Sequence, residues 1–243
     1  MAQPNTRRTM NSSHALLFVL ACAPLACRSA ASTDAAKEAA ATASSPQAAA
    51  TTTTSQPQDS AKPAALGELA PDFSLPDLDG KPVHLADYHG KIVVLEWFNP
   101  ECPFVKASHT KGSLLEAAAK ATGTGVVWLS INSGAPGKQG HGVEKNREGQ
   151  ARFKMTNPIL LDETGKVGKL YGAAHTPHMY VINAEGKLVY RGAIDNSPDG
   201  EGDSPTGGTL IRYVDQAISA LTGGKPIATA DTEAYGCSVK YAH

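Results

Sequence analysis

The stretch that decides the fold is residues 95–106, which read LEWFNPECPFVK. It overlaps the apolar run 91–98, whose β-branched residues predict a strand buried on both faces. Cys102 falls where this strand ends and a helix begins, because Pro103 is favoured at the first position of a helix. The unpaired N–H groups of a helix N-terminus favour a thiolate, which is the nucleophilic form of cysteine. The sequence therefore predicts a reactive Cys102, the alternative being a buried, inert cysteine.

The rest of the chain up to residue 221 supplies the other elements of an α/β fold. We expect two short extended pieces within 67–85, a helix over 103–121, a strand over 125–131, a helix over 141–155, a strand over 157–161, a hairpin over 179–190 and a helix over 209–221. This order of strands and helices predicts a central β-sheet flanked by helices on both faces.

Composition excludes several classes of protein. The 243 residues carry 22 basic and 23 acidic side chains, a net charge of −1, so there is no electrostatic footprint for nucleic acid. The four cysteines are too few and too scattered for a disulfide scaffold or a clustered zinc site. We expect no metal and no cofactor.

The N-terminus is typical of an export signal. Arg7 and Arg8 precede the apolar run 15–21, which stops at Cys22. Residues 19–22 (VLAC) resemble the lipobox of bacterial lipoproteins, in which the cysteine is lipidated, so we expect a signal peptide over 1–21 and a lipid on Cys22. Lipidation of Cys27 and ordinary cleavage near Ala30 are the alternatives.

Residues 22–66 are predicted to form a disordered tether. The segment 28–65 contains no Leu, Ile, Val, Met or aromatic residue, so it cannot bury enough apolar surface to offset the entropy of ordering. The folded domain is therefore expected to span residues 67–243, held at the outer face of a membrane by its anchor.

The segment around Cys102 resembles the active site of the thioredoxin superfamily, in particular its alkyl hydroperoxide reductase/thiol-specific antioxidant (redoxin) group. The resemblance implies a thioredoxin-like fold with a mixed sheet and matches Cys102 to the first cysteine of Cys-x-x-Cys. It also matches Glu96 to a buried acid that shuttles protons, for which burial predicts a raised pKa. Thr176 and Pro177 match the segment whose proline has a cis peptide bond, and with Pro103 they are expected to shape the substrate groove.

Two departures from the family pattern narrow this resemblance. Position 105 is valine, so the second cysteine of the motif is missing, and Leu95 and Asn99 stand where peroxiredoxins have proline and threonine before their cysteine. The closest resemblance is to peroxiredoxin-like proteins that keep only the first cysteine and end in Gly-Cys-Ser-(Ile/Val)-Lys. Residues 235–241 of this chain read YGCSVKY and contain Cys237.

A single nucleophilic cysteine needs a second thiol to release its mixed disulfide. Cys237 is the expected catalytic partner of Cys102, provided that the C-terminal tail folds back over the domain. The alternative is that Cys237 packs against the fold and an external thiol resolves Cys102.

The sequence thus predicts an exported, thiol-based oxidoreductase of the bacterial cell envelope. Its expected partners are a disulfide or peroxide substrate and an external thiol reductant. The alternative function is a non-catalytic binding module, such as a metallochaperone that uses Cys102 with His175 or His178.

Overall fold

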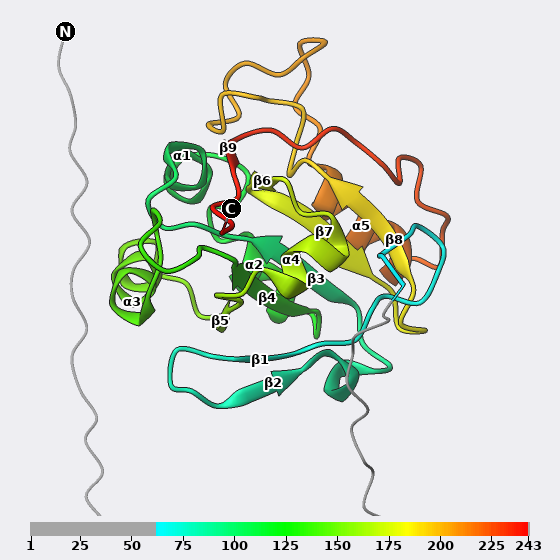
Figure 1. Cartoon of the computed structure of the whole chain (residues 1–243). Coiled ribbons are helices and arrows are strands. Elements are labelled where there is room, and N and C mark those ends of the chain that lie inside the picture. The colour runs from blue at the N-terminus through cyan, green and yellow to red at the C-terminus, as the bar shows by residue number, and fades with distance from the viewer. Residues whose placement is uncertain (1–61, 243) are drawn as a thin grey trace, which may run out of the picture. The chain divides into compact units, whose positions relative to one another are not determined.

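A five-stranded mixed sheet lies at the centre of the computed structural model, which describes residues 62–242 (Figure 1). Strand β3 (Val93–Trp97) runs parallel to β4 (Val127–Asn132) and antiparallel to β7 (His178–Ile182). Strand β5 (Ile159–Leu161) pairs with β4, and β8 (Leu188–Gly192) pairs with β7. The strand order β5-β4-β3-β7-β8 confirms the predicted α/β fold with a mixed sheet.

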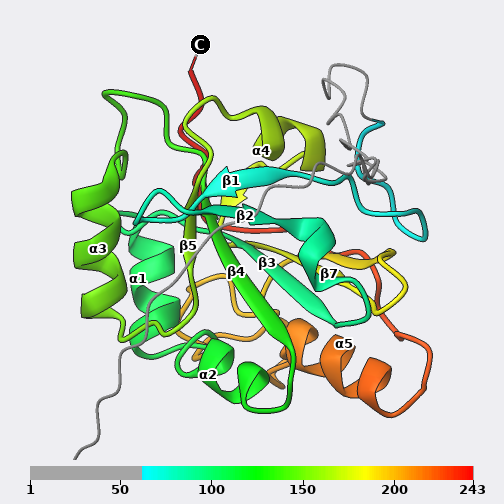
Figure 2. The ribbon, with the colours of Figure 1, turned by 90° about the horizontal axis from the view of Figure 1, so that it is seen from below.

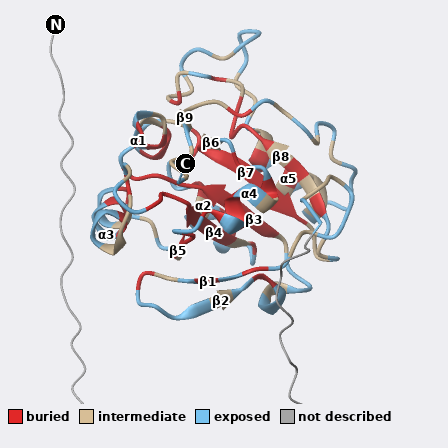
Figure 3. Ribbon diagram, in the orientation of Figure 1, coloured by how far each residue is buried: buried red, intermediate tan, exposed pale blue. Residues whose placement is uncertain are grey.

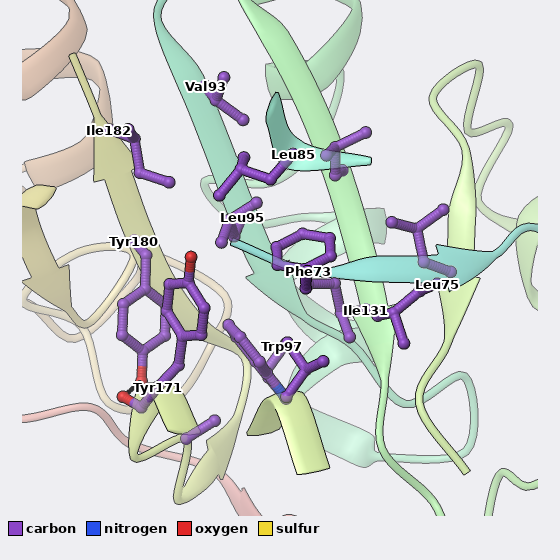
Figure 4. Close-up of a cluster of buried hydrophobic side chains, with 14 of the residues drawn as sticks. Phe73, Leu75, Leu85, Val93, Leu95, Trp97, Ile131, Tyr171, Tyr180 and Ile182 are labelled. Atoms are coloured by element: carbon purple, nitrogen blue, oxygen red, sulfur yellow. Dashed lines mark hydrogen bonds between the residues drawn. The ribbon is translucent and has the colours of Figure 1, made fainter. Parts of the chain in front are cut away.

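The central strand β3 is buried on both faces, as its continuous apolar run predicted (Figure 3). Leu95 and Trp97 face a cluster that also contains Phe73, Tyr171 and Tyr180 (Figure 4). Val94 faces the opposite cluster, because successive side chains of a strand point to opposite faces.

Helices cover both faces of the sheet, as predicted (Figure 2). On one face lie the hairpin of β1 (Ser74–Pro76) and β2 (Pro82–His84), the 3-10 helix η1 (Leu85–Tyr88) and α4 (Lys166–Tyr171). On the other face lie α2 (Ala117–Thr122) and α5 (Tyr213–Thr222). Helices α1 (Pro103–Thr110) and α3 (Val143–Arg152) flank the β5 side, and the two-residue strands β6 (His175–Thr176) and β9 (Cys237–Ser238) form a separate pair.

The prediction of one continuous helix over 103–121 is wrong. The chain leaves the helical path after α1 and resumes it at α2, with Glu116 in the left-handed region at φ 58°. At the break, Gly112 packs so closely on the backbone of Gly200 that a Cβ would lie 2.2 Å from its carbonyl oxygen. A contact between segments so distant in sequence leaves no signal in the local helical pattern.

Two short helices, η1 and α4, and the two-residue strands β6 and β9 were not predicted. Helix α4 is six residues long, and the Asp162 carboxylate accepts hydrogen bonds from the backbone N–H groups of Val167 and Gly168 in its first turn. Among the residues that the structure describes, no helix is long and apolar enough to cross a membrane.

Residues shortly before the expected domain start at Gly67 already contact the domain. The backbone N–H of Ala64 donates to the carbonyl of Leu170, and Leu66 packs against the cluster around Trp97. The predicted signal peptide, Cys22 and most of the predicted tether fall within 1–61, outside the described residues.

Candidate active site

Cys102 is the N-cap residue of α1, directly after the segment that leaves β3. Its backbone is extended, and Pro103 occupies the first turn of the helix, as the sequence predicted. The side chain has no exposed surface, and its Sγ donates a hydrogen bond of 3.1 Å to the carbonyl oxygen of Thr176. The strand-to-helix junction therefore aims Cys102 inward at the chain that precedes β7.

Thr176 and Pro177 lie beside Cys102 because β7 is the antiparallel neighbour of β3. The register places His178 opposite Trp97, so the residues before β7 and the residues after β3 meet at the same end of the sheet. The Thr176–Pro177 peptide bond is cis, as the resemblance implied. Both residues are buried, whereas Pro103 is exposed.

The C-terminal tail folds back onto this segment. Strand β9 pairs antiparallel with β6, and Cys237 stands opposite Thr176 in the register (Figure 1). The tail therefore occupies the edge of the Thr176 segment, where the substrate groove was expected.

Both cysteines of the site are free thiols, and they lie close enough to influence each other's ionisation. Besides burial, the pKa of Cys237 responds to the Phe104 N–H at the start of α1, which lowers it, and to hydrogen bonding with Cys102, which raises it. Burial, then this hydrogen bond and the charge of Cys102, raise the pKa of Cys237 to about 11. Cys237 thus keeps its proton at neutral pH, next to Cys102.

Glu96 is fully buried, but the expected rise of its pKa is wrong. Burial alone would raise the pKa, yet the nearby charge of His109 and hydrogen bonds from three side chains outweigh it and hold the pKa below its ordinary value. His109 Nε2 lies 2.7 Å from Oε1, while Trp128 Nε1 and Ser130 Oγ each donate to Oε2 at 3.0 Å. Both carboxylate oxygens are occupied, and Cys102 is not among their partners.

Sequence reasoning missed His109, although a signal for it exists. Val105 and His109 follow Cys102 by three and seven residues, which places all three on one face of a helix that starts there. His109 is 5% exposed, and its ring stacks on Phe153 with centroids 5.2 Å apart. A histidine at this spacing in a buried stripe predicts a buried acidic partner.

Within the described residues, the two histidines that flank the cis proline, His175 and His178, are not part of a group of three or more side chains placed to hold a metal ion. Burial, followed by the charges of His175 and Arg191, lowers the pKa of His178 to about 4, so its ring is neutral. Its Nδ1 accepts the N–H of Ala174 at 3.3 Å. Within residues 62–242, no group of three or more His, Cys, Asp or Glu side chains is placed to hold a metal ion.

Comparison with known proteins gives the site a family context. The sequence matches the model of the Redoxin family over residues 65–209. It is 35% identical to the thiol-disulfide oxidoreductase ResA of Geobacillus thermodenitrificans over 125 residues, 51% of this chain and 67% of that protein. It is 27% identical to the peroxiredoxin Bcp of Escherichia coli over 134 residues, 53% of this chain and 85% of that protein.

Solved structures resemble nearly the whole described domain. A hypothetical protein of Sinorhizobium meliloti matches with a TM-score of 0.63 at 28% identity, over 75% of this chain and 97% of that one. An uncharacterized conserved protein of Geobacillus kaustophilus matches with a TM-score of 0.63 at 31% identity, over 73% and 93%. The chain therefore belongs to the redoxin family of thioredoxin-like, thiol-based oxidoreductases.

Proposed function

We propose that the chain is a thiol–disulfide oxidoreductase in which Cys102 is the nucleophile and Cys237 the resolving cysteine. The observation that carries this proposal is that the pairing of β9 with β6 places Cys237 opposite Thr176, the residue whose carbonyl oxygen accepts a hydrogen bond from Cys102. A disulfide requires Cα atoms within about 7 Å, and a hydrogen bond between two cysteine side chains is consistent with such a separation.

The reaction proceeds in two exchanges. The Cys102 thiolate attacks one sulfur of a substrate disulfide, forms a mixed disulfide and releases the other substrate sulfur as a thiolate. Cys237, after losing its proton to that thiolate, attacks the Cys102 sulfur and releases the second substrate sulfur as a thiolate, which takes a proton from solvent. The substrate disulfide is thereby reduced to two thiols, and the Cys102–Cys237 dithiol is oxidised to a disulfide, which an external thiol reductant returns to the dithiol.

The start of α1 supports both sulfurs during these steps. Cys102 is the N-cap residue of α1, although its side chain makes no capping hydrogen bond, and the Phe104 N–H of the first turn acts on Cys237. Backbone N–H groups at a helix N-terminus stabilise negative charge, so either cysteine gains support as a thiolate. The carbonyl oxygen of Thr176 accepts a hydrogen bond from the Cys102 thiol and holds that side chain in place until the thiol ionises.

We propose a positioning role for Glu96 in place of the proton relay expected from sequence. Its carboxylate joins β3 to α1 through His109, and both oxygens are occupied by other donors. This buried pair fixes the helix whose N-cap is Cys102. Pro103 and Pro177 remain candidate substrate-contacting residues once the tail has moved from the edge of β6.

Peroxide reduction is the second candidate, favoured by the similarity to the peroxiredoxin Bcp. The Cys102 thiolate would attack a peroxide oxygen, releasing water or an alcohol after proton transfer, and become a sulfenic acid. Cys237 would then attack the Cys102 sulfur, forming the same disulfide and releasing water. The departures at Leu95 and Asn99 favour disulfides over peroxides as substrates.

Export and lipid anchoring at Cys22 complete the proposal. They rest on the VLAC sequence at 19–22 and on the composition of the following segment. The substrate would then be a protein or small-molecule disulfide outside the cytoplasm.

A comparison of two substrates tests the proposed function. Turnover of the reduced protein should be measured on insulin disulfides and on hydroperoxides, with Cys102→Ser as the inactive reference. We expect turnover on disulfides that Cys102→Ser abolishes. Turnover on hydroperoxides alone would make the second candidate the function, and turnover that survives Cys102→Ser would contradict both.

A further inference from the structure

The tail that carries Cys237 is attached through β9, through residues 239–241 that follow it, and also through a residue two positions before Cys237. The hydroxyl of Tyr235 donates a hydrogen bond of 2.7 Å to Oδ1 of Asp195, and its ring lies 6.3 Å from the ring of Phe104. Phe104 is also the residue whose N–H reaches the Cys237 sulfur. Tyr235 therefore contacts the same turn of α1 that supports the two thiols.

Asp195 connects the tail to the active-site helix. Its carboxylate is 1% exposed and accepts the Ser113 hydroxyl, the Ser197 N–H at 2.9 Å and the Tyr235 hydroxyl. Ser113 belongs to the break that follows α1, and Ser197 belongs to the segment between β8 and α5. One buried carboxylate thus joins three segments that are distant in sequence, one of them the tail.

The residue between Tyr235 and Cys237 makes the tail's position sensitive to this attachment. Gly236 has φ +118°, and a Cβ there would lie 2.3 Å from the carbonyl oxygen of Thr176. The tail therefore packs closely on Thr176 at Gly236, the one residue that separates Tyr235 from Cys237.

We infer that the Tyr235–Asp195 hydrogen bond is a latch that holds Cys237 against Cys102, which makes Tyr235 and Asp195 positioning residues for the redox reaction. This inference rests on the proposed pairing of the two cysteines. When the latch is made, the tail is confined, and the effective concentration of Cys237 at the Cys102 sulfur is high. When it is broken, the tail samples open positions in which Cys102 is accessible.

The size of the effect follows from the bond that is lost. A hydrogen bond to a buried charged group contributes enough that its removal should lower the effective concentration of Cys237 about tenfold. Loss of this hydrogen bond destabilises the closed position of the tail. It should therefore lower the stability of the Cys102–Cys237 disulfide and increase the exposure of Cys102.

Tyr235→Phe tests the latch, because it removes one hydroxyl and keeps the ring against Phe104. In the full chain, the Cys102–Cys237 equilibrium against a glutathione buffer should shift toward the dithiol about tenfold. Alkylation of Cys102 in the reduced protein should be faster by a similar factor. Tyr88→Phe, the same change in η1, should leave both quantities unchanged, and Asp195→Asn should shift both in the direction of Tyr235→Phe.

The two readouts separate failure of the latch from failure of the proposed function. An unchanged disulfide equilibrium and an unchanged alkylation rate in Tyr235→Phe would overturn the latch. If the wild-type protein forms no Cys102–Cys237 disulfide, the proposed resolving role fails. Faster alkylation of Cys102 in Tyr235→Phe would still establish the latch in that case.

Discussion

The Glu96 carboxylate accepts a 2.7 Å hydrogen bond from His109 at a place where both side chains are almost fully buried. The pair ties the central strand to the helix whose N-cap is Cys102. Removing one partner of such a pair leaves an uncompensated polar group in the core. The pair therefore predicts how stability depends on sequence and on pH.

Glu96→Gln should destabilise the domain by about 3 kcal/mol at neutral pH, because His109 loses its charged partner. The folded-state pKa of Glu96 lies below its ordinary value, so the stability it contributes is present above the unfolded pKa of about 4.3 and is lost as pH falls through the folded pKa. Chemical unfolding measured across this pH range should show that the free energy of unfolding falls less steeply toward acid pH in Glu96→Gln than in wild type.

Glu68→Gln is the matched control, because that side chain is exposed and forms a surface ion pair with Lys62 at 3.4 Å. Its stability should stay within about 0.5 kcal/mol of wild type. Equal stability of Glu96→Gln and Glu68→Gln would contradict the structural importance of the buried pair.

Gly236→Ala should displace the tail, because its Cβ would clash with the Thr176 carbonyl and its φ is unfavourable for alanine. We expect alkylation of Cys102 to accelerate by about tenfold as its cover is lost, in line with a penalty of 1–2 kcal/mol. Gly224→Ala also has a positive φ but nothing within 4 Å of the added Cβ, so it controls for backbone strain. Equal alkylation rates in the two variants would show that the tail does not cover Cys102.

Cys22→Ala should abolish lipidation and release the protein from the membrane fraction, as the VLAC sequence predicts. Membrane fractionation and intact mass measure this outcome. Cys27→Ala is the matched control and should retain both the lipid mass and the membrane location. Retention of the lipid mass in Cys22→Ala would reject the lipobox.

Much of the fold could be predicted because its signals are local. The continuous apolar run 91–98 identified β3, the two apolar runs that flank the turn at 183–187 identified β7 and β8, and Pro103 marked the start of α1. The break after α1 could not be predicted, since it depends on the approach of Gly200 to Gly112. Strand β9 is only two residues long, which is too short for a periodic pattern.

The candidate site was predictable to a similar extent. Cys102, Thr176 and Pro177 stand out through their motifs, and the structure brings them together. The pKa of Glu96 was misjudged because burial was counted without its partner His109, which lies on another element. Whether Cys237 reaches Cys102 depends on how the tail packs, and sequence left both alternatives open.

The central claim is that Cys102 and Cys237 form the redox-active pair. Peptide mapping of the full chain after oxidation, with free thiols blocked before digestion, tests this most directly. The account predicts one cross-linked species that joins the Cys102 peptide to the Cys237 peptide, and its loss after reduction by a dithiol. Cys102 and Cys237 both recovered as free thiols, or wild-type disulfide turnover in Cys237→Ser, would contradict it.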